Sequence, residues 1–270
     1  MPKVKAGEIN LEYYIEGSGP PLLMIMGFSG QASSWGEPFL EALRPHFSVI
    51  RFSNRGTGES DRPQTPTTVH VMADDAAALL DALGVARAHV LGISMGGMVA
   101  QELALSHAGI VNGLALGCTT AGGAERVAAS PEIFALMLPV PGLSPEEQIR
   151  KAWPALCSAS FVESGNGFLE AMLQASLVNA PPIETLAKQM SAVQGFDAHE
   201  RVSQIKAPTL VVHGDADVLV PPENGRILHE RIAGCEMRII AGAGHMFFWE
   251  KPEESAGAIT EFLSRVPSGV

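Results

Sequence analysis

The sequence predicts an α/β fold in which a mostly parallel central sheet is flanked by helices. The apolar run at 22–26 is short and continuous, as in a strand that is covered on both faces, and the pattern at 47–52 predicts another strand. Segments with helical spacing alternate with such runs along most of the chain. Because strand–helix–strand crossovers are right-handed, a series of them builds a parallel sheet with helices on both faces.

The expected elements are separated by clear turn residues. The first strand, 9–15, alternates apolar and polar residues and is therefore half-buried. A turn at 17–21, rich in glycine and proline, separates it from the strand at 22–26. A helix at 69–83 ends at Gly84, and a strand that leads to Ser94 follows. Further strands are expected at 47–52, 114–116, 209–212 and 237–240, and further helices near 223–233 and 252–265.

The alternation stops between about 122 and 196. This stretch carries amphipathic helical patterns, including 145–156 and 168–178, and its many prolines divide it into short pieces. We expect residues 122–196 to form an inserted helical cap over the carboxyl ends of the strands, and residues 1–121 and 197–270 to form the core domain. A run of surface helices without a capping role is the alternative interpretation.

Composition limits the partners of the chain. Its 270 residues are 46% apolar, enough for one large core, and the formal net charge is −11. Scattered lysines and arginines in an acidic chain argue against nucleic acid or an anionic membrane as partner. The first residues lack the apolar stretch of a secretory signal, and no segment is long enough to span a membrane. Three cysteines without a C-x-x-C pair indicate a reducing, cytoplasmic compartment.

The segment Gly92-Ile93-Ser94-Met95-Gly96 is the strongest indication of chemistry. It joins an apolar strand to a helix-patterned segment, and its glycines allow the sharp turn that exposes a serine hydroxyl. The N–H groups at the start of the following helix point toward the same place, where they stabilise an anion. Ser94 is therefore the candidate nucleophile.

A serine needs a base to take its proton and an acid to orient that base. His245 lies in a glycine-rich loop after the last strand and is the favoured base; His213, at the end of a strand, is the rival. Asp217 is the favoured acid, since the apolar segment after it would shield it from water. Asp215 is the alternative acid, although it directly follows the strand and is suited to capping the turn.

The intermediate of acyl transfer needs two backbone N–H donors, which form an oxyanion hole. Met95, directly after the nucleophile, is expected to supply one. Phe28, in the loop after the strand 22–26, is expected to supply the other, and its ring would wall the pocket. A simple glycine-rich connection is the alternative interpretation of this loop.

Four motifs, in order along nearly the whole chain, resemble those of the α/β-hydrolase superfamily. They are Asn54-Arg55-Gly56-Thr57-Gly58-Glu59-Ser60, Gly92-Ile93-Ser94-Met95-Gly96-Gly97, His213-Gly214-Asp215-Ala216-Asp217 and Gly242-Ala243-Gly244-His245. The resemblance implies the α/β-hydrolase fold with its triad in the order Ser, Asp, His, and we interpret the Arg55 turn as structural. One departure is Met26-Gly27, where many relatives have His-Gly.

Within the superfamily the chain is most similar to capped carboxylesterases and the cofactor-free haloperoxidase group. This resemblance implies a serine hydrolase that cleaves a carboxylic ester or lactone of small to medium apolar character, without metal or organic cofactor. The partner is then a small-molecule ester. Perhydrolysis or C–C bond hydrolysis by the same triad is the alternative activity, and a ligand-sensing protein of the same fold is the alternative from another class. Haloalkane dehalogenases use an aspartate nucleophile, so Ser94 argues against their chemistry.

Large apolar side chains of the core loops and the cap are candidates for the substrate pocket. For those of the cap, packing onto the core domain is the alternative interpretation. The candidates are Trp35, Met137, Trp153, Phe161, Phe168 and Met246.

Overall fold

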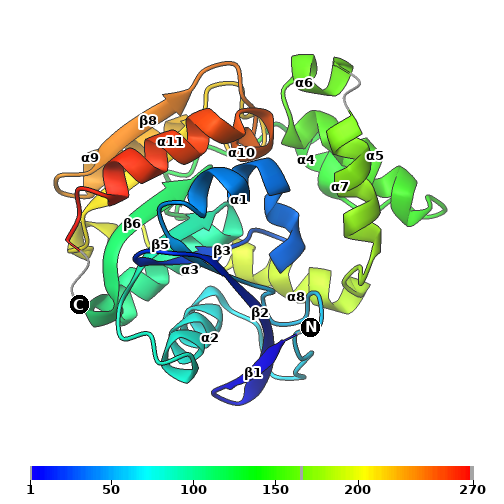
Figure 1. The fold of residues 1–270 in the computed structure, drawn as a ribbon. Coiled ribbons are helices and arrows are strands. Elements are labelled where there is room, and N and C mark those ends of the chain that lie inside the picture. The colour runs from blue at the N-terminus through cyan, green and yellow to red at the C-terminus, as the bar shows by residue number, and fades with distance from the viewer. Residues whose placement is uncertain (1, 165–166, 268–270) are drawn as a thin grey trace.

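The computed structural model describes residues 2–164 and 167–267. Over these residues the chain forms an eight-stranded sheet in the order β1-β2-β4-β3-β5-β6-β7-β8 (Figure 1). β2 pairs antiparallel with β1 and β4, and the pairings from β4 to β8 are all parallel. The mostly parallel sheet is therefore confirmed. Its strands are β1 Lys3–Ala6, β2 Ile9–Gly17, β3 Pro21–Ile25, β4 Ser48–Phe52, β5 Ala88–Ile93, β6 Val111–Gly117, β7 Thr209–Gly214 and β8 Glu236–Ile240.

Helices cover both faces of this sheet, and β3 shows why its sequence is continuously apolar. Leu23 and Ile25 lie in the core beneath α2, α3 and α9, while Leu22 and Met24 lie in the opposite core beneath α1 and α11. Successive side chains of a strand point to opposite faces, so a strand between two helical layers has no polar side. The helices of the two layers are α1 Glu37–Leu43, α2 Val69–Ala82, α3 Met95–Ser106, α9 Glu223–Arg231, α10 Phe247–Glu250 and α11 Pro252–Leu263, with 3₁₀ turns at Ala32–Trp35, Ala108–Ile110 and Val202–Gln204.

Two strands differ from the sequence-based expectations. The sequence does not predict β1, which carries Lys3 and Lys5 and is largely exposed at the edge of the sheet. Charged residues are common on edge strands, where they discourage pairing with other chains. β6 begins at Val111, before the start predicted at 114, and is buried along its whole length. The sequence pattern misses this start because Asn112 and Gly113 interrupt the run of apolar residues.

Five helices lie between β6 and β7 in the described part of the chain. A β-bridge pairs Gly122 with Asp197, and the Ala198 N–H donates to the Ala121 carbonyl (2.8 Å). The stretch 122–196 therefore leaves the core and returns to it at one place, and we refer to it as the helical insertion. Figure 1 shows α4–α7 grouped at one side of the sheet. The helices are α4 Pro131–Met137, α5 Pro145–Leu156, α6 Ala159–Glu163, α7 Gly167–Leu177 and α8 Ile183–Gln194.

Among residues 2–164 and 167–267, every helix is too short or too polar to cross a bilayer.

Candidate active site

Ser94 stands at a strained turn between β5 and α3. Its backbone has φ 54° and ψ −124°, a left-handed conformation that a residue with a side chain rarely adopts. The flanking glycines are required by close approach, since a Cβ on Gly92 would collide with the Gly96 carbonyl and one on Gly96 with the Ile25 carbonyl. The Ser94 N–H donates to the Gly117 carbonyl (2.9 Å), which fixes the turn to the neighbouring strand. The sequence motif thus folds into the sharp strand-to-helix turn that was predicted for it.

Asp217 and His245 form a buried pair at the ends of β7 and β8. His245 Nδ1 lies 2.8 Å from Asp217 Oδ2, and each residue is only 3% exposed. The other carboxylate oxygen, Oδ1, accepts from the N–H groups of Leu219 (3.0 Å) and Val220 (2.8 Å). The loop after β7 therefore holds the carboxylate in one orientation, with one oxygen directed at the imidazole.

The electrostatics of this pair favour the charged carboxylate. Burial acts to raise the pKa of Asp217, but the positive charge of His245 and hydrogen bonds from His213 and His245 outweigh burial and lower that pKa to about 2. Burial likewise acts to lower the pKa of His245, yet the Asp217 charge in direct contact raises that pKa well above 6.5. An imidazole in this position gains a proton readily, as a general base must.

Cys118 connects the pair to the serine turn. It directly follows β6, is fully buried, and has a positive φ of 41°. Burial raises the pKa of its thiol, opposed by the charge of His245, a hydrogen bond with His245 and a hydrogen bond with the Ser94 backbone. Cys118 thus lies between the imidazole and the turn that carries the serine. Ser94 follows β5, and Asp217 and His245 follow β7 and β8, so all three lie beyond the carboxyl ends of parallel strands, with β6 between the serine and the pair. Ser94 Oγ has no hydrogen bond with His245 among the described residues.

The loop after β3 runs directly over the serine. A Cβ on Gly27 would lie 3.0 Å from Ser94 Cβ and 3.6 Å from Ser94 Oγ. Met95 is the first residue of α3, so its N–H has no acceptor within the helix. Neither this N–H nor that of Phe28 is hydrogen-bonded to another described residue. The two donors predicted for an oxyanion hole are therefore free on either side of the serine turn.

The rival histidine and acid occupy other positions. His213 is fully buried; its Nε2 donates to the Val220 carbonyl (2.8 Å) and lies 3.3 Å from Asp217 Oδ2. A carbonyl oxygen only accepts, so the proton of this ring is on Nε2. Asp215 accepts from the Gly242 N–H (2.6 Å) and so joins the two loops at the exposed surface. His213 thus contacts the acid and its loop, and Asp215 ties loops together.

The predicted pocket side chains fall into separate groups. Trp35 is fully buried in the core, with its ring centroid 6.1 Å from that of Phe39 and 5.4 Å from that of Phe248. Phe161 and Phe168 contact each other in the helical insertion (6.3 Å between centroids). Met137, Trp153 and Met246, the remaining three, are half-buried.

Two residues that sequence reasoning missed connect the helical insertion to the core. The ring of Trp249 on α10 lies 5.6 Å from that of Phe168 and 5.9 Å from that of Phe248, and so joins the insertion to the core. Gln189 on α8 is fully buried, and its Oε1 accepts from the Ser29 N–H (2.9 Å) in the loop beside Phe28. No local signal marks Gln189, because it occupies an ordinary position of an amphipathic helix. Trp249 could have been found as an aromatic residue near His245.

Comparison with known proteins agrees with this geometry. Residues 20–252 match the family model described as the alpha/beta hydrolase fold. The chain belongs to the α/β-hydrolase family.

A protein of Azorhizobium caulinodans named carbamate hydrolase RutD is 31% identical over 94% of both chains. A poly(3-hydroxyalkanoate) depolymerase of Ectopseudomonas oleovorans is 33% identical over 84% of this chain and 79% of its own. The crystal structure of the enol-lactonase of Burkholderia xenovorans LB400 has a TM-score of 0.86 and 26% identity, covering 97% of this chain and all of its own. This α/β hydrolase is therefore an enzyme that cleaves bonds with water.

Proposed function

We propose that this hydrolase cleaves a carboxylic ester or lactone of small to medium apolar character through an acyl-enzyme on Ser94. The observation that carries the proposal is the buried Asp217–His245 pair (2.8 Å) at the same edge of the sheet as the strained turn of Ser94. His213 is engaged by the acid and by a backbone carbonyl, which supports His245 as the base.

The mechanism follows from these positions. Ser94 Oγ attacks the carbonyl carbon while His245 takes the hydroxyl proton, and Asp217 stabilises the imidazolium through the Nδ1–H hydrogen bond. The N–H groups of Phe28 and Met95 stabilise the oxyanion. The C–O bond to the alcohol breaks, and His245 gives its proton to the departing oxygen. Water, deprotonated by His245, then attacks the acyl group; the products are a carboxylic acid and free Ser94.

The relatives support the bond type. The names of two of them, a depolymerase of poly(3-hydroxyalkanoate) and an enol-lactonase, both refer to ester linkages. The rings of Phe168 and Trp249 contact each other and, together with Met246, which directly follows His245 in the chain, would offer an apolar surface for the acyl or alcohol part. The helical insertion would then act as a cap over the site. We also propose a cytoplasmic location, since Cys118, Cys157 and Cys235 are all free.

Ester turnover by Ser94→Ala tests the proposal. We expect kcat/KM on a short p-nitrophenyl ester to fall by about four orders of magnitude, with an unchanged circular dichroism spectrum, because the nucleophile is lost. Ser264→Ala, at the exposed end of α11, is the matched control and should behave as wild type. An organophosphorus reagent should add to the wild-type protein at Ser94, as read by peptide mass spectrometry. Turnover by Ser94→Ala within about tenfold of wild type would refute the acyl-enzyme.

A further inference from the structure

A buried hydroxyl outside the predicted site bonds to the turn that carries the candidate nucleophile. Thr119 lies just after β6, is 1% exposed, and its Oγ1 is 2.7 Å from the carbonyl oxygen of Ser94. A carbonyl oxygen only accepts, so the hydroxyl of Thr119 is the donor. The same carbonyl accepts from the N–H groups of Gly97 (2.9 Å) and Met98 (3.2 Å), which belong to α3 itself. Thr119 therefore supports the turn from the end of a neighbouring strand.

The carbonyl that Thr119 holds belongs to the peptide group between Ser94 and Met95. In a planar trans peptide the C=O and the N–H point in opposite directions, so a bond that fixes the Ser94 oxygen also fixes the Met95 N–H. That N–H has no acceptor among the described residues and is one of the two donors proposed for the oxyanion hole. A hydrogen bond to the carbonyl also polarises the peptide and strengthens its N–H as a donor.

Close packing keeps the Thr119 side chain in this position. A Cβ on Gly97 would lie 2.6 Å from Thr119 Cβ and 2.7 Å from its Oγ1, so only glycine leaves room for the threonine. Gln101, one turn further along α3, is fully buried and donates from Nε2 to the carbonyls of Gly97 and Thr120 (3.1 Å each). These contacts join the segment after β6 to the first turn of α3 and restrict the Thr119 side chain.

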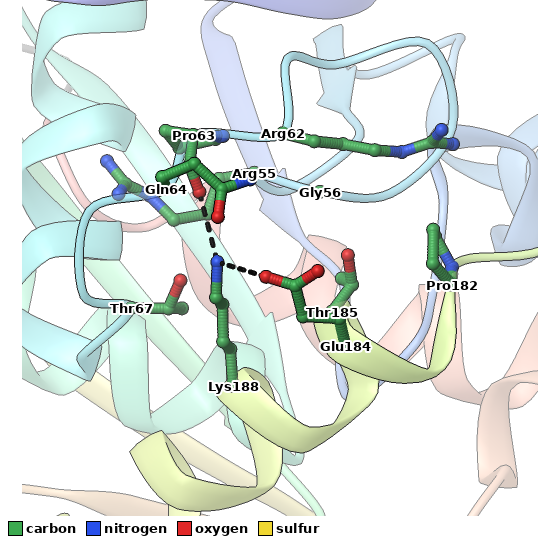
Figure 2. Close-up of a pocket in the computed structure, with 10 residues that line it drawn as sticks. All are labelled: Arg55, Gly56, Arg62, Pro63, Gln64, Thr67, Pro182, Glu184, Thr185 and Lys188. Atoms are coloured by element: carbon green, nitrogen blue, oxygen red, sulfur yellow. Dashed lines mark hydrogen bonds and ion pairs between the residues drawn. The ribbon is translucent and has the colours of Figure 1, made fainter.

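A similar contact between a glycine and a threonine lies away from the candidate site and supplies a control for packing. A Cβ on Gly56 would lie 2.6 Å from Thr185 Cγ2. Figure 2 shows both residues beside a cavity of about 130 Å³ between the turn after β4 and α8. This contact joins the core to the helical insertion, whereas the contact of Gly97 with Thr119 brings a hydroxyl to the Ser94 carbonyl.

We propose that Thr119 is a positioning residue, which orients and polarises the peptide between Ser94 and Met95 for stabilisation of the oxyanion. This inference rests on the proposed ester hydrolysis, in which negative charge develops on the substrate oxygen during both acylation and deacylation. An interaction that gains strength only in the transition state changes kcat, while uniform binding changes KM. Loss of the Thr119 hydroxyl should therefore lower kcat and leave KM nearly unchanged.

Steady-state kinetics of Thr119 variants on p-nitrophenyl acetate test this role. Thr119→Val keeps the shape of the side chain, but a methyl group cannot approach a carbonyl oxygen to 2.7 Å, so the peptide shifts and loses a donor. We expect kcat to fall about 10- to 100-fold, with KM within about threefold of wild type. Thr119→Ala should show the same loss. Thr119→Ser differs from Thr119→Ala only by the hydroxyl and should keep kcat within about threefold of wild type.

The affinity for a trifluoromethyl ketone provides a second measurement. Ser94 would add to this ketone and form a tetrahedral oxyanion that resembles the transition state. Its Ki should rise about 10- to 100-fold in Thr119→Val and Thr119→Ala, and Thr119→Ser should restore most of the affinity. Thr209→Val is the hydroxyl control, since Thr209 Oγ1 donates to the Ala207 carbonyl (2.8 Å) at the start of β7. Thr185→Val is the packing control, and both controls should keep wild-type kcat and Ki.

The outcomes separate this role from the proposed function. Wild-type kcat and Ki in Thr119→Val and Thr119→Ala would overturn the role of Thr119 and leave the proposed hydrolysis standing. Equal losses in Thr119→Ser and Thr119→Ala would also overturn it, since the hydroxyl would then not be the cause. A wild-type protein that neither hydrolyses the ester nor binds the ketone would refute the proposed hydrolysis, and this inference with it.

Discussion

The two halves of the candidate site are held by different parts of the molecule. The Asp217–His245 half is fixed within the core, by the N–H groups of Leu219 and Val220 on the carboxylate. The loop 27–31 on the other side is tied to the helical insertion. Ser29 donates to Gln189, and Gln31 Nε2 donates to the carbonyls at 178 and 179 (3.2 and 3.3 Å). The carboxylate of Asp217 is thus oriented by N–H groups of the core, whereas Ser29 and Gln31 of the loop 27–31 find hydrogen-bond partners in the insertion.

Removal of the acid tests the core half and should have the largest effect. Asp217→Asn should lower kcat by about 10³- to 10⁴-fold on a p-nitrophenyl ester, because an amide no longer holds His245 in the required tautomer. Asp215→Asn is the matched control, since Asp215 is exposed and its side chain bonds only to the Gly242 N–H among described residues. Comparable losses in both variants would contradict the separate roles of the two aspartates.

Removal of Gln189 tests the insertion half and should cost less. Gln189→Leu leaves the Ser29 N–H without its acceptor and frees the loop that carries Phe28, so kcat/KM should fall by about 10- to 100-fold. Gln189→Glu keeps an acceptor oxygen and should recover part of this loss. Gln194→Leu, exposed at the end of the same helix, controls for changes to α8 itself. Equal kcat/KM values for Gln189→Leu and Gln194→Leu would show that the hydrogen bond from Ser29 to Gln189 does not position the loop 27–31 for catalysis.

The pH profile sharpens the distinction between the halves. His245 acts as base only when neutral, and Asp217 raises its pKa well above 6.5. The neutral fraction therefore grows as pH rises through that pKa, and kcat/KM should fall about tenfold per pH unit below it. Profiles from about pH 5 to about pH 9 should show this limb unchanged in Gln189→Leu and shifted to lower pH in Asp217→Asn. If the acidic limb does not move in Asp217→Asn, then a group other than His245 is responsible for it.

The smallest expected effect concerns Glu250, a carboxylate that joins the His245 loop to the helical insertion. Glu250 accepts from the Gly244 N–H beside His245 (2.9 Å) and from the Ser158 N–H of the insertion (3.1 Å). Glu250→Gln weakens these charge-assisted bonds and should lower the free energy of unfolding by about 1–2 kcal/mol, with kcat/KM within about threefold of wild type. Urea unfolding measures the first quantity, with Glu253→Gln as the exposed control. Equal free energies of unfolding for Glu250→Gln and Glu253→Gln would show that the hydrogen bonds of Glu250 do not stabilise the fold.

Local patterns in the sequence were sufficient to predict the parallel sheet and to select Ser94, Asp217 and His245. Apolar runs and glycine turns depend on neighbouring residues; Ser94 lies directly after such a run, and Asp217 and His245 lie in the loops that follow the runs 209–212 and 237–240. The same reasoning placed Trp35 in a pocket, whereas the structure buries it against Phe39 and Phe248. A large apolar side chain looks alike in sequence whether it faces a ligand or a core.

The sequence by itself determined the order of strands and helices and the type of chemistry, because periodicity and turn geometry are properties of short segments. Only the tertiary structure decided which side chains meet. Ser29 and Gln189 are 160 residues apart, and Arg55 meets Asp75 of α2 only when the turn after β4 packs on that helix. Such contacts arise from the packing of the whole chain into dense layers, which no local pattern records.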